Sequence, residues 1–256
     1  MKYRTQINLL TIMVFEEENA LRITSFMETN QTLVMTNRTH RIRWYDATVK
    51  DLRVFRIPIE FLTYNFENMR IEGQLIEEIN KIGNDLDFEE ESDREIYTGI
   101  FEETLQQGSD KTKTSRLKKS IANTQQDTPA IISYGGIILD GNRRFMVLKQ
   151  LFNEESIKSD GIPDRFKYME VVRLDVGISK SQLLAIQTLN QLFEEDRVDY
   201  TLINQALAVR KLRTAGYDRL AIAKMFNTDS TDIEEFEEVL NLIDFFLEEN
   251  ELKKRY

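Results

Sequence analysis

The stretch that decides the fold is PAIISYGGIILDGNRRFMVLKQL, residues 129–151. Two short apolar runs in it flank the pair Gly135-Gly136, which is typical of a tight turn between two strands. The polar segment 140–144 follows the second run. An amphipathic pattern of Phe, Val and Leu then predicts a helix. The stretch is therefore expected to fold as strand, turn, strand, loop and helix.

The polar segment, DGNRR, has the composition of an anion-binding loop. Gly141 allows the backbone to approach a ligand closely, and Asp140 or Asn142 can cap the helix. Arg143 and Arg144 are adjacent in the first helical turn, where the helix dipole favours acidic side chains. The two arginines therefore call for a compensating negative charge. A phosphate group at the helix N-terminus supplies one; the alternative is a capped helix with two solvated arginines.

The segment GIILDGNRR with the helix after it, residues 136–149, resembles the signature of the ParB/sulfiredoxin superfamily. The upstream segments RLKKSI (116–121) and IPIEFL (57–62) resemble the family's preceding helix and its opening strand. The resemblance extends from about residue 56 to about residue 200 and contains an insertion. It implies an α/β fold (α+β in looser usage), a small mixed sheet with helices, in which the loop before the helix holds nucleotide phosphates.

The resemblance also implies which residues form the site. The side chains and glycines expected to bind ATP or CTP are Arg70, Gly136, Gly141, Asn142, Arg143, Arg144 and Asn190. Asp140 is expected to orient the loop or to act on Mg²⁺-bound water, so that Asp140, Arg143 and Arg144 form the candidate catalytic set.

The segment QTLNQLFEEDRVD, residues 187–199, resembles another family motif. Asn190 matches the family's asparagine, whereas Leu189 and Phe193 stand where the family has Glu and Arg. The candidate metal ligands are Glu194 and Glu195, since Mg²⁺ prefers carboxylate and phosphate oxygens.

The composition excludes several kinds of site. The 256 residues contain no cysteine, so disulfides, a thiolate nucleophile and a cysteine-based zinc site are excluded. The single histidine, His40, excludes a histidine-rich metal site. No apolar run approaches 18 residues, which argues against a membrane span, and no cleavage pattern follows the N-terminal apolar run. A cytoplasmic location is therefore expected.

The distribution of charge leaves open an alternative function in DNA binding. The net charge of −10 opposes non-specific binding of nucleic acid by the whole molecule. The region 38–56 is nevertheless basic, and Trp44 and Tyr45 within it offer rings on which bases could stack. Strands with a solvated cationic face are the alternative, which the charge pattern favours. The acidic region 72–110 is a solvated insertion or a surface for a basic protein partner.

The C-terminal region 200–256 is expected to be helical, with spacing around Gly216 and Ile222 that resembles a helix-turn-helix (HTH) unit. Its presumed reading helix carries five carboxylates, Asp232, Glu234, Glu235, Glu237 and Glu238. These oppose an approach to the DNA backbone. We therefore expect this unit to pack, to form a homodimer or to meet a basic partner.

Three segments are expected in the domain organisation, one of which contains an insertion. They are a β-rich extension (1–56), a nucleotide-binding domain (57–199) with the acidic insertion 72–110, and a helical HTH-like domain (200–256). The resemblance implies a protein that binds and hydrolyses ATP or CTP with Mg²⁺, as an NTPase or nuclease, in DNA partition, DNA modification or phage defence. The alternatives are a DNA-binding or partition-type module without catalysis, and an acidic protein-interaction component.

Overall fold

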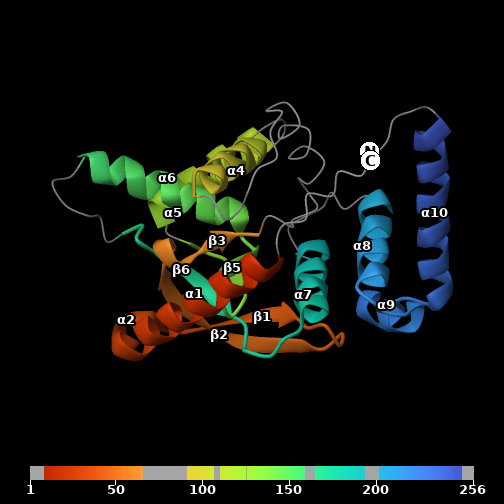
Figure 1. Ribbon diagram of the computed structural model, residues 1–256, viewed down its shortest axis with the longest axis horizontal. Helices are drawn as coiled ribbons and strands as arrows, with labels where there is room; N and C mark the ends of the chain where they lie inside the picture. Colours follow the sequence, from red (N-terminus) through yellow and green to blue (C-terminus); the bar gives the residue numbers. More distant parts are fainter. Residues whose placement is uncertain are drawn as a thin grey trace. The chain divides into compact units, whose positions relative to one another are not determined.

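The computed structural model shows how these segments fold (Figure 1). It describes residues 9–65, 91–106, 110–124, 126–158, 165–193 and 202–249. The chain divides into two compact units, each built from two separate segments of sequence. The first unit comprises Met1–Arg38 and Arg53–Asp175, and the second comprises Thr39–Leu52 and Val176–Tyr256.

A mixed six-stranded sheet is built from the described residues. Its strands are β1 (Met35–Arg43), β2 (Val49–Pro58), β3 (Thr63–Tyr64), β4 (Ala130–Ile132), β5 (Ile137–Asp140) and β6 (Tyr168–Arg173). They lie in the order β1-β2-β6-β4-β5-β3. The β2–β6 and β4–β5 pairs are antiparallel, whereas the β4–β6 and β3–β5 pairs are parallel. The predicted mixed α/β class is therefore confirmed.

The directions of the strands bring several loops to one edge of the sheet. Because β5 runs antiparallel to β4, the end of β5 lies beside the start of β4, and Asp140 pairs with Ile131. The start of β6 lies at the same edge, since β6 is parallel to β4. The ends of β2 and β3 also meet this edge, as the pairing of Pro58 with Tyr168 shows for β2. We call it the loop edge, and it holds the β5–α6 loop.

Helices complete the first unit. They are α1 (Leu9–Thr29), α2 (Gln31–Val34), the 3₁₀ turn η1 (Ile59–Phe61), α4 (Glu91–Thr104), α5 (Asp110–Thr124) and α6 (Asn142–Lys158). Their apolar faces and the sheet share one core, whose fully buried members include Ile23, Ile57, Phe101, Ile138, Met146 and Met169. Burial of such side chains contributes about 1.5–3 kcal/mol each. This core holds the start of α6 and the end of β5 in place.

The region 1–56, which was expected to be a β-rich extension, contains a long helix. Residues Leu9–Thr29 form α1, which continues through the acidic run Glu16-Glu17-Glu18. The helix is stabilised by tertiary contacts: buried Asn19 donates from Nδ2 to the carbonyls of Phe61 and Gly135, both at 2.7 Å. The strands β1 and β2 follow it, so the region is part helix and part sheet.

The second unit packs a set of helices around its own core. The helices are α7 (Lys180–Leu192), α8 (Leu202–Thr214), α9 (Arg219–Phe226) and α10 (Ser230–Glu249). Ser179 caps α7 through a capping box with Gln182. Tyr45 and Ala47, from the turn after β1, pack against the core that α7 to α10 share. The second segment of this unit begins at Val176, whereas the expected boundary lay near residue 199.

None of the helices in the described part of the chain combines the length and the apolar character that crossing a membrane requires.

Candidate functional site

The β5–α6 loop contains Gly141 in a conformation that other residues rarely adopt. Its φ is +105°, in the left-handed region that favours glycine. A Cβ atom at this position would lie 2.8 Å from the Cβ of Ala130 and 3.2 Å from the Arg144 guanidinium. Gly141 therefore brings the backbone close to β4, and its carbonyl accepts the first bond of α6, from the amide of Phe145 at 2.9 Å.

The ion pair Asp140–Arg144 supplies part of the negative charge that the two arginines of the first helical turn require. Nη2 of Arg144 lies 2.7 Å from Oδ2 of Asp140, and the two side chains are only 12% and 10% exposed. The carboxylate at the end of β5 thus supplies an anion for one arginine of the first helical turn. It also fixes the guanidinium beside the backbone of the loop. Arg143, next to it, is half-buried in the same turn.

Asn142 connects the start of α6 to the neighbouring strands. Its side chain is buried, donating from Nδ2 to the carbonyl of Ile138 at 3.4 Å and accepting from the amide of Asn65 at 3.4 Å. The amide group therefore links β5 and the residue after β3 across the loop edge. In this arrangement Asn142 positions the loop, and the backbone N–H groups of the first turn of α6 are the groups that a phosphate would meet.

The remaining predicted residues lie elsewhere. Gly136 lies immediately before β5, one strand length from Gly141, and an added Cβ there would meet the carbonyl of Phe61 at 2.6 Å. Its place is beneath α1, away from the loop. Asn190 belongs to the second unit, where its Nδ2 donates to the carbonyls of Arg43 and Ile186. The last three, Arg70, Glu194 and Glu195, lie outside the described residues.

A polar cluster beside the loop was missed by the sequence analysis. The hydroxyl of buried Tyr64 donates to Oε1 of Glu102 at 2.7 Å, and Nζ of Lys149 lies 2.8 Å from the same oxygen. Burial, followed by the charge of Glu102, raises the pKa of Tyr64 well above its ordinary value of 10.0. The three residues come from β3, α4 and α6, so only the tertiary structure brings them together.

The alternative nucleic-acid surface at residues 38–56 has most of its groups engaged within the protein. Trp44 is only 5% exposed, with Nζ of Lys50 lying 3.9 Å from its ring centroid, so it has no free face on which a base could stack. The guanidinium of Arg43 lies 4.5 Å from the ring centroid of Phe193, and Arg41 faces Asp51. These contacts support the interpretation that the cations stabilise the protein itself.

The acidic helix α10 also uses its carboxylates internally. Arg219 of α9 contacts Glu234 at 2.8 Å and Glu237 at 2.7 Å, and Arg210 of α8 contacts Asp244 at 2.6 Å. The acidic residues therefore help α10 to pack against α8 and α9. This outcome matches the expectation that the helix packs; its role in binding DNA or a partner stays a prediction.

A metal site built by the protein alone is absent from the described residues, which contain no group of three or more His, Asp or Glu side chains able to hold an ion. The expected carboxylates, Glu194 and Glu195, lie outside them. The chain is thus a mixed α/β protein whose candidate site is a glycine loop at a strand-to-helix junction, with its cations in the first helical turn.

Comparisons with known proteins do not assign the chain to a family. No family model matches the chain, and no curated protein matches it. Among solved structures, it is similar to the C-terminally truncated chromosome-partitioning protein ParB from Caulobacter crescentus complexed with CTP-gamma-S. The two share 13% identity over 78% of this chain and 87% of that chain, with a TM-score of 0.32. A likeness of this strength does not define a family, so the function proposed next rests on the chain's own residues.

Proposed function

We propose that the chain binds the phosphate groups of a nucleotide, ATP or CTP, at the N-terminus of α6. The observation that carries this proposal is the β5–α6 loop, where Gly141 at φ +105° leads directly into a helix of 17 residues. The first turn of α6 contains no acidic side chain and two arginines. Helix N–H groups, the helix dipole and guanidinium groups all favour a bound anion.

The residues present fit phosphate chemistry. Arg144 is held by Asp140, so its position is set before a ligand arrives and little side-chain entropy is lost on binding. Arg143 follows Asn142, whose amide fixes the start of the helix. Gly141 leaves the backbone without a side chain at the point where the loop turns. In the proposed complex, Arg143 and the first N–H groups of α6 neutralise the phosphates, while Asp140 acts as a positioning residue.

Mg²⁺ is part of the proposal because it accompanies nucleotide phosphates in most proteins that bind them. Phosphate oxygens and water molecules would supply its ligands. Hydrolysis would then depend on how the site positions the nucleotide and the attacking water, and on stabilisation of the charge that develops on the phosphate oxygens. A role in a DNA-related process stays a prediction from the sequence.

The test is calorimetric titration with ATP, CTP, GTP and UTP, with and without Mg²⁺. Arg143→Gln removes one cation from the first turn and keeps a side chain of similar length. A lost charge-assisted hydrogen bond weakens binding by about 1.5–3 kcal/mol, or roughly ten- to a hundredfold. Arg116→Gln, at an exposed position of α5, is the matched control and should leave the affinity within about twofold.

The Asp140–Arg144 pair needs its own variant, because removing one partner alone also destabilises the fold. Asp140→Asn with Arg144→Gln removes both charges and keeps two polar side chains of similar size. This double variant should fold, as far-UV circular dichroism can check, and should bind nucleotide at least about tenfold more weakly. Wild-type affinity in both Arg143→Gln and the double variant would overturn the proposed site.

A further inference from the structure

A pocket of about 340 Å³ lies in the first unit, next to β2 and β6. Small-molecule sites usually span about 300–1,000 Å³, so this pocket has the size for a small ligand. The polar side chains that line it are Arg56, Gln126, Arg165 and Glu170. They come from the end of β2, the segment before β4, the turn before β6 and β6 itself. We call this the Arg56 pocket.

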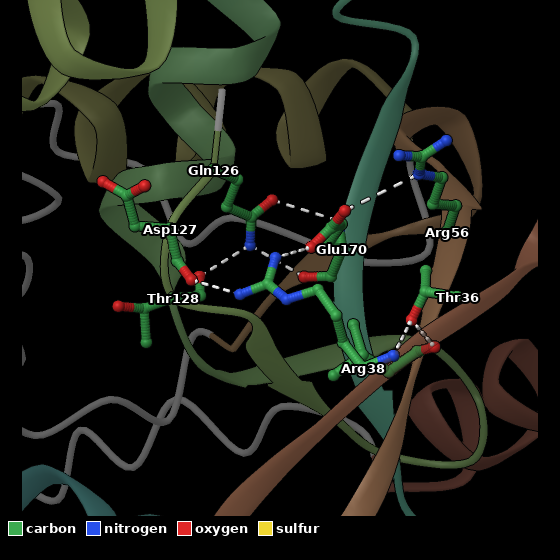
Figure 2. Close-up of polar contacts among 8 residues, drawn as sticks. Thr36, Arg38, Arg56, Gln126, Asp127, Thr128 and Glu170 are labelled. Carbon is green, nitrogen blue, oxygen red and sulfur yellow. Dashed lines mark hydrogen bonds and ion pairs between the residues drawn. The ribbon is translucent and has the colours of Figure 1, made fainter. Parts of the chain in front are cut away.

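Two arginines contact Glu170, the one acidic residue among the described residues that line the pocket (Figure 2). The carboxylate of Glu170 is 14% exposed and faces two arginines, with Oε2 contacted by Arg38 and Oε1 lying 3.6 Å from Nε of Arg56. Arg38 also donates from Nη2 to the carbonyl of Asp127 at 2.7 Å. Arg165 also lines the pocket, so Glu170 is the one acidic residue of a described lining that holds two arginines, in a protein whose net charge is −10. A local cationic site persists against the charge of the whole molecule.

The guanidinium of Arg56 has the capacity to bind an anion. At 3.6 Å its contact with Glu170 is an ion pair that is too long for a hydrogen bond. Within the described part of the chain, this ion pair is the one polar contact of the Arg56 side chain, which is 46% exposed. The terminal Nη1 and Nη2 atoms form the fork that binds carboxylate or phosphate through two parallel hydrogen bonds.

The polar wall of the pocket is held rigidly. The side-chain amide of Gln126 donates to the carbonyl of Glu170 at 2.7 Å and accepts from the amide of Glu170 at 3.0 Å, in the manner of a strand neighbour. Figure 2 shows Gln126, Arg38 and Glu170 pointing toward one another. Arg165 is fixed by a bond to the carbonyl of Ala122 and by the ring of Phe166, 5.0 Å away. A preorganised wall reduces the entropy lost on binding.

The rest of the pocket lining is apolar and aromatic. It is formed by Ile121 of α5, Leu148 of α6, Phe166 and Tyr168. We propose that the Arg56 pocket binds a small organic anion that carries one carboxylate or phosphate group on an aromatic body. The acidic group meets the forks of Arg56 and Arg165, and the aromatic body packs against Phe166 and Tyr168. This site does not depend on the nucleotide site of α6.

The test uses phenyl phosphate and phenylacetate as probes, titrated into the full chain by calorimetry, with phenylacetamide as the uncharged analogue. Both anions should bind, and phenylacetamide should bind at least about tenfold more weakly. Arg56→Gln should reduce the affinity for phenyl phosphate by about tenfold or more. Arg53→Gln is the matched control, because Arg53 is an exposed arginine of the same strand that does not line the pocket.

Three results would overturn the proposal. The first is equal affinity of phenyl phosphate for the wild type, Arg56→Gln and Arg165→Gln. The second is equal affinity for inorganic phosphate and phenyl phosphate, which would remove the role of the aromatic wall. The third is displacement of phenyl phosphate by ATP together with its loss in Arg143→Gln, which would make the pocket part of the nucleotide site. Binding retained in Arg143→Gln and lost in Arg56→Gln would support an independent site.

Discussion

Replacing Asp140 by alanine removes the ion pair that holds Arg144 at the start of α6. The two side chains are 10% and 12% exposed, and their charged atoms lie 2.7 Å apart. Removing one partner of a buried ion pair destabilises a protein by about 3–5 kcal/mol, because the other charged group stays buried without a counter-charge. A tenth of each side chain still reaches water, so we expect about 3 kcal/mol for Asp140→Ala.

A second pair on the same helix provides the control. Glu154 of α6 contacts Lys118 of α5, but the two side chains are 48% and 31% exposed. Exposed pairs contribute about 0–1 kcal/mol, since water screens the charges. Glu154→Ala should therefore lower the free energy of unfolding by less than about 1 kcal/mol.

The assay is urea unfolding followed by far-UV circular dichroism, with the midpoint and the slope fitted for each variant. A double-mutant cycle of Asp140→Ala and Arg144→Ala separates the pair from other contacts of either residue. The double variant should be less destabilised than the sum of the single variants by about 2 kcal/mol. Additive single effects, or equal losses for Asp140→Ala and Glu154→Ala, would refute the view that this ion pair organises the loop.

Gly141→Ala should destabilise the protein by about 2–4 kcal/mol in the same assay, since it combines a φ of +105° with a Cβ 2.8 Å from that of Ala130. Gly99→Ala, in a helix with nothing within 4 Å of the new Cβ, should stabilise it by about 0.5–1 kcal/mol; the same sign for both would contradict this reasoning. Asn19→Ala leaves two backbone carbonyls without their donor and should lower the free energy of unfolding by about 1–3 kcal/mol, seen as a lower thermal midpoint. The raised pKa of Tyr64 keeps its proton in the folded state above pH 10.0, where the unfolded chain has lost it, so stability falls with rising pH in that range. Tyr64→Phe should therefore lose stability less steeply than the wild type between pH 10 and 11, by up to about 1.4 kcal/mol per pH unit, and parallel curves would be evidence against a buried phenol.

Much of the central stretch could be predicted because its signals are local. The turn at Gly135-Gly136, the strand before Gly141 and the helix after it depend on turn chemistry and on hydrophobic periodicity. The capping box at Ser179 is equally local. The helix α1 was missed because the contacts that hold it are distant in sequence: the amide of Asn19 bonds to Gly135, 116 residues away.

The contacts of the candidate sites follow from strand register, which the sequence does not reveal. Asp140 and Arg144 are four residues apart, but the pair joins a strand to a helix, so the rule for neighbours on one helix does not predict it. Arg56 and Glu170 meet because β2 and β6 pair in one register, and a shift by one residue would turn one of them to the other face of the sheet. The sequence shows where the arginines are, but it does not predict which carboxylate each of them pairs with.

The composition of the second unit limits how this protein can be divided. Its core includes Tyr45 and Ala47, which lie more than a hundred residues before the helices that they contact. A fragment that starts at Val176 would lack these two side chains and would present apolar surface to water. A stable C-terminal fragment therefore requires the segment 39–52 as well, which a circularly permuted gene could supply. Recombination at the level of DNA meets the same constraint, because a single crossover cannot transfer this unit whole.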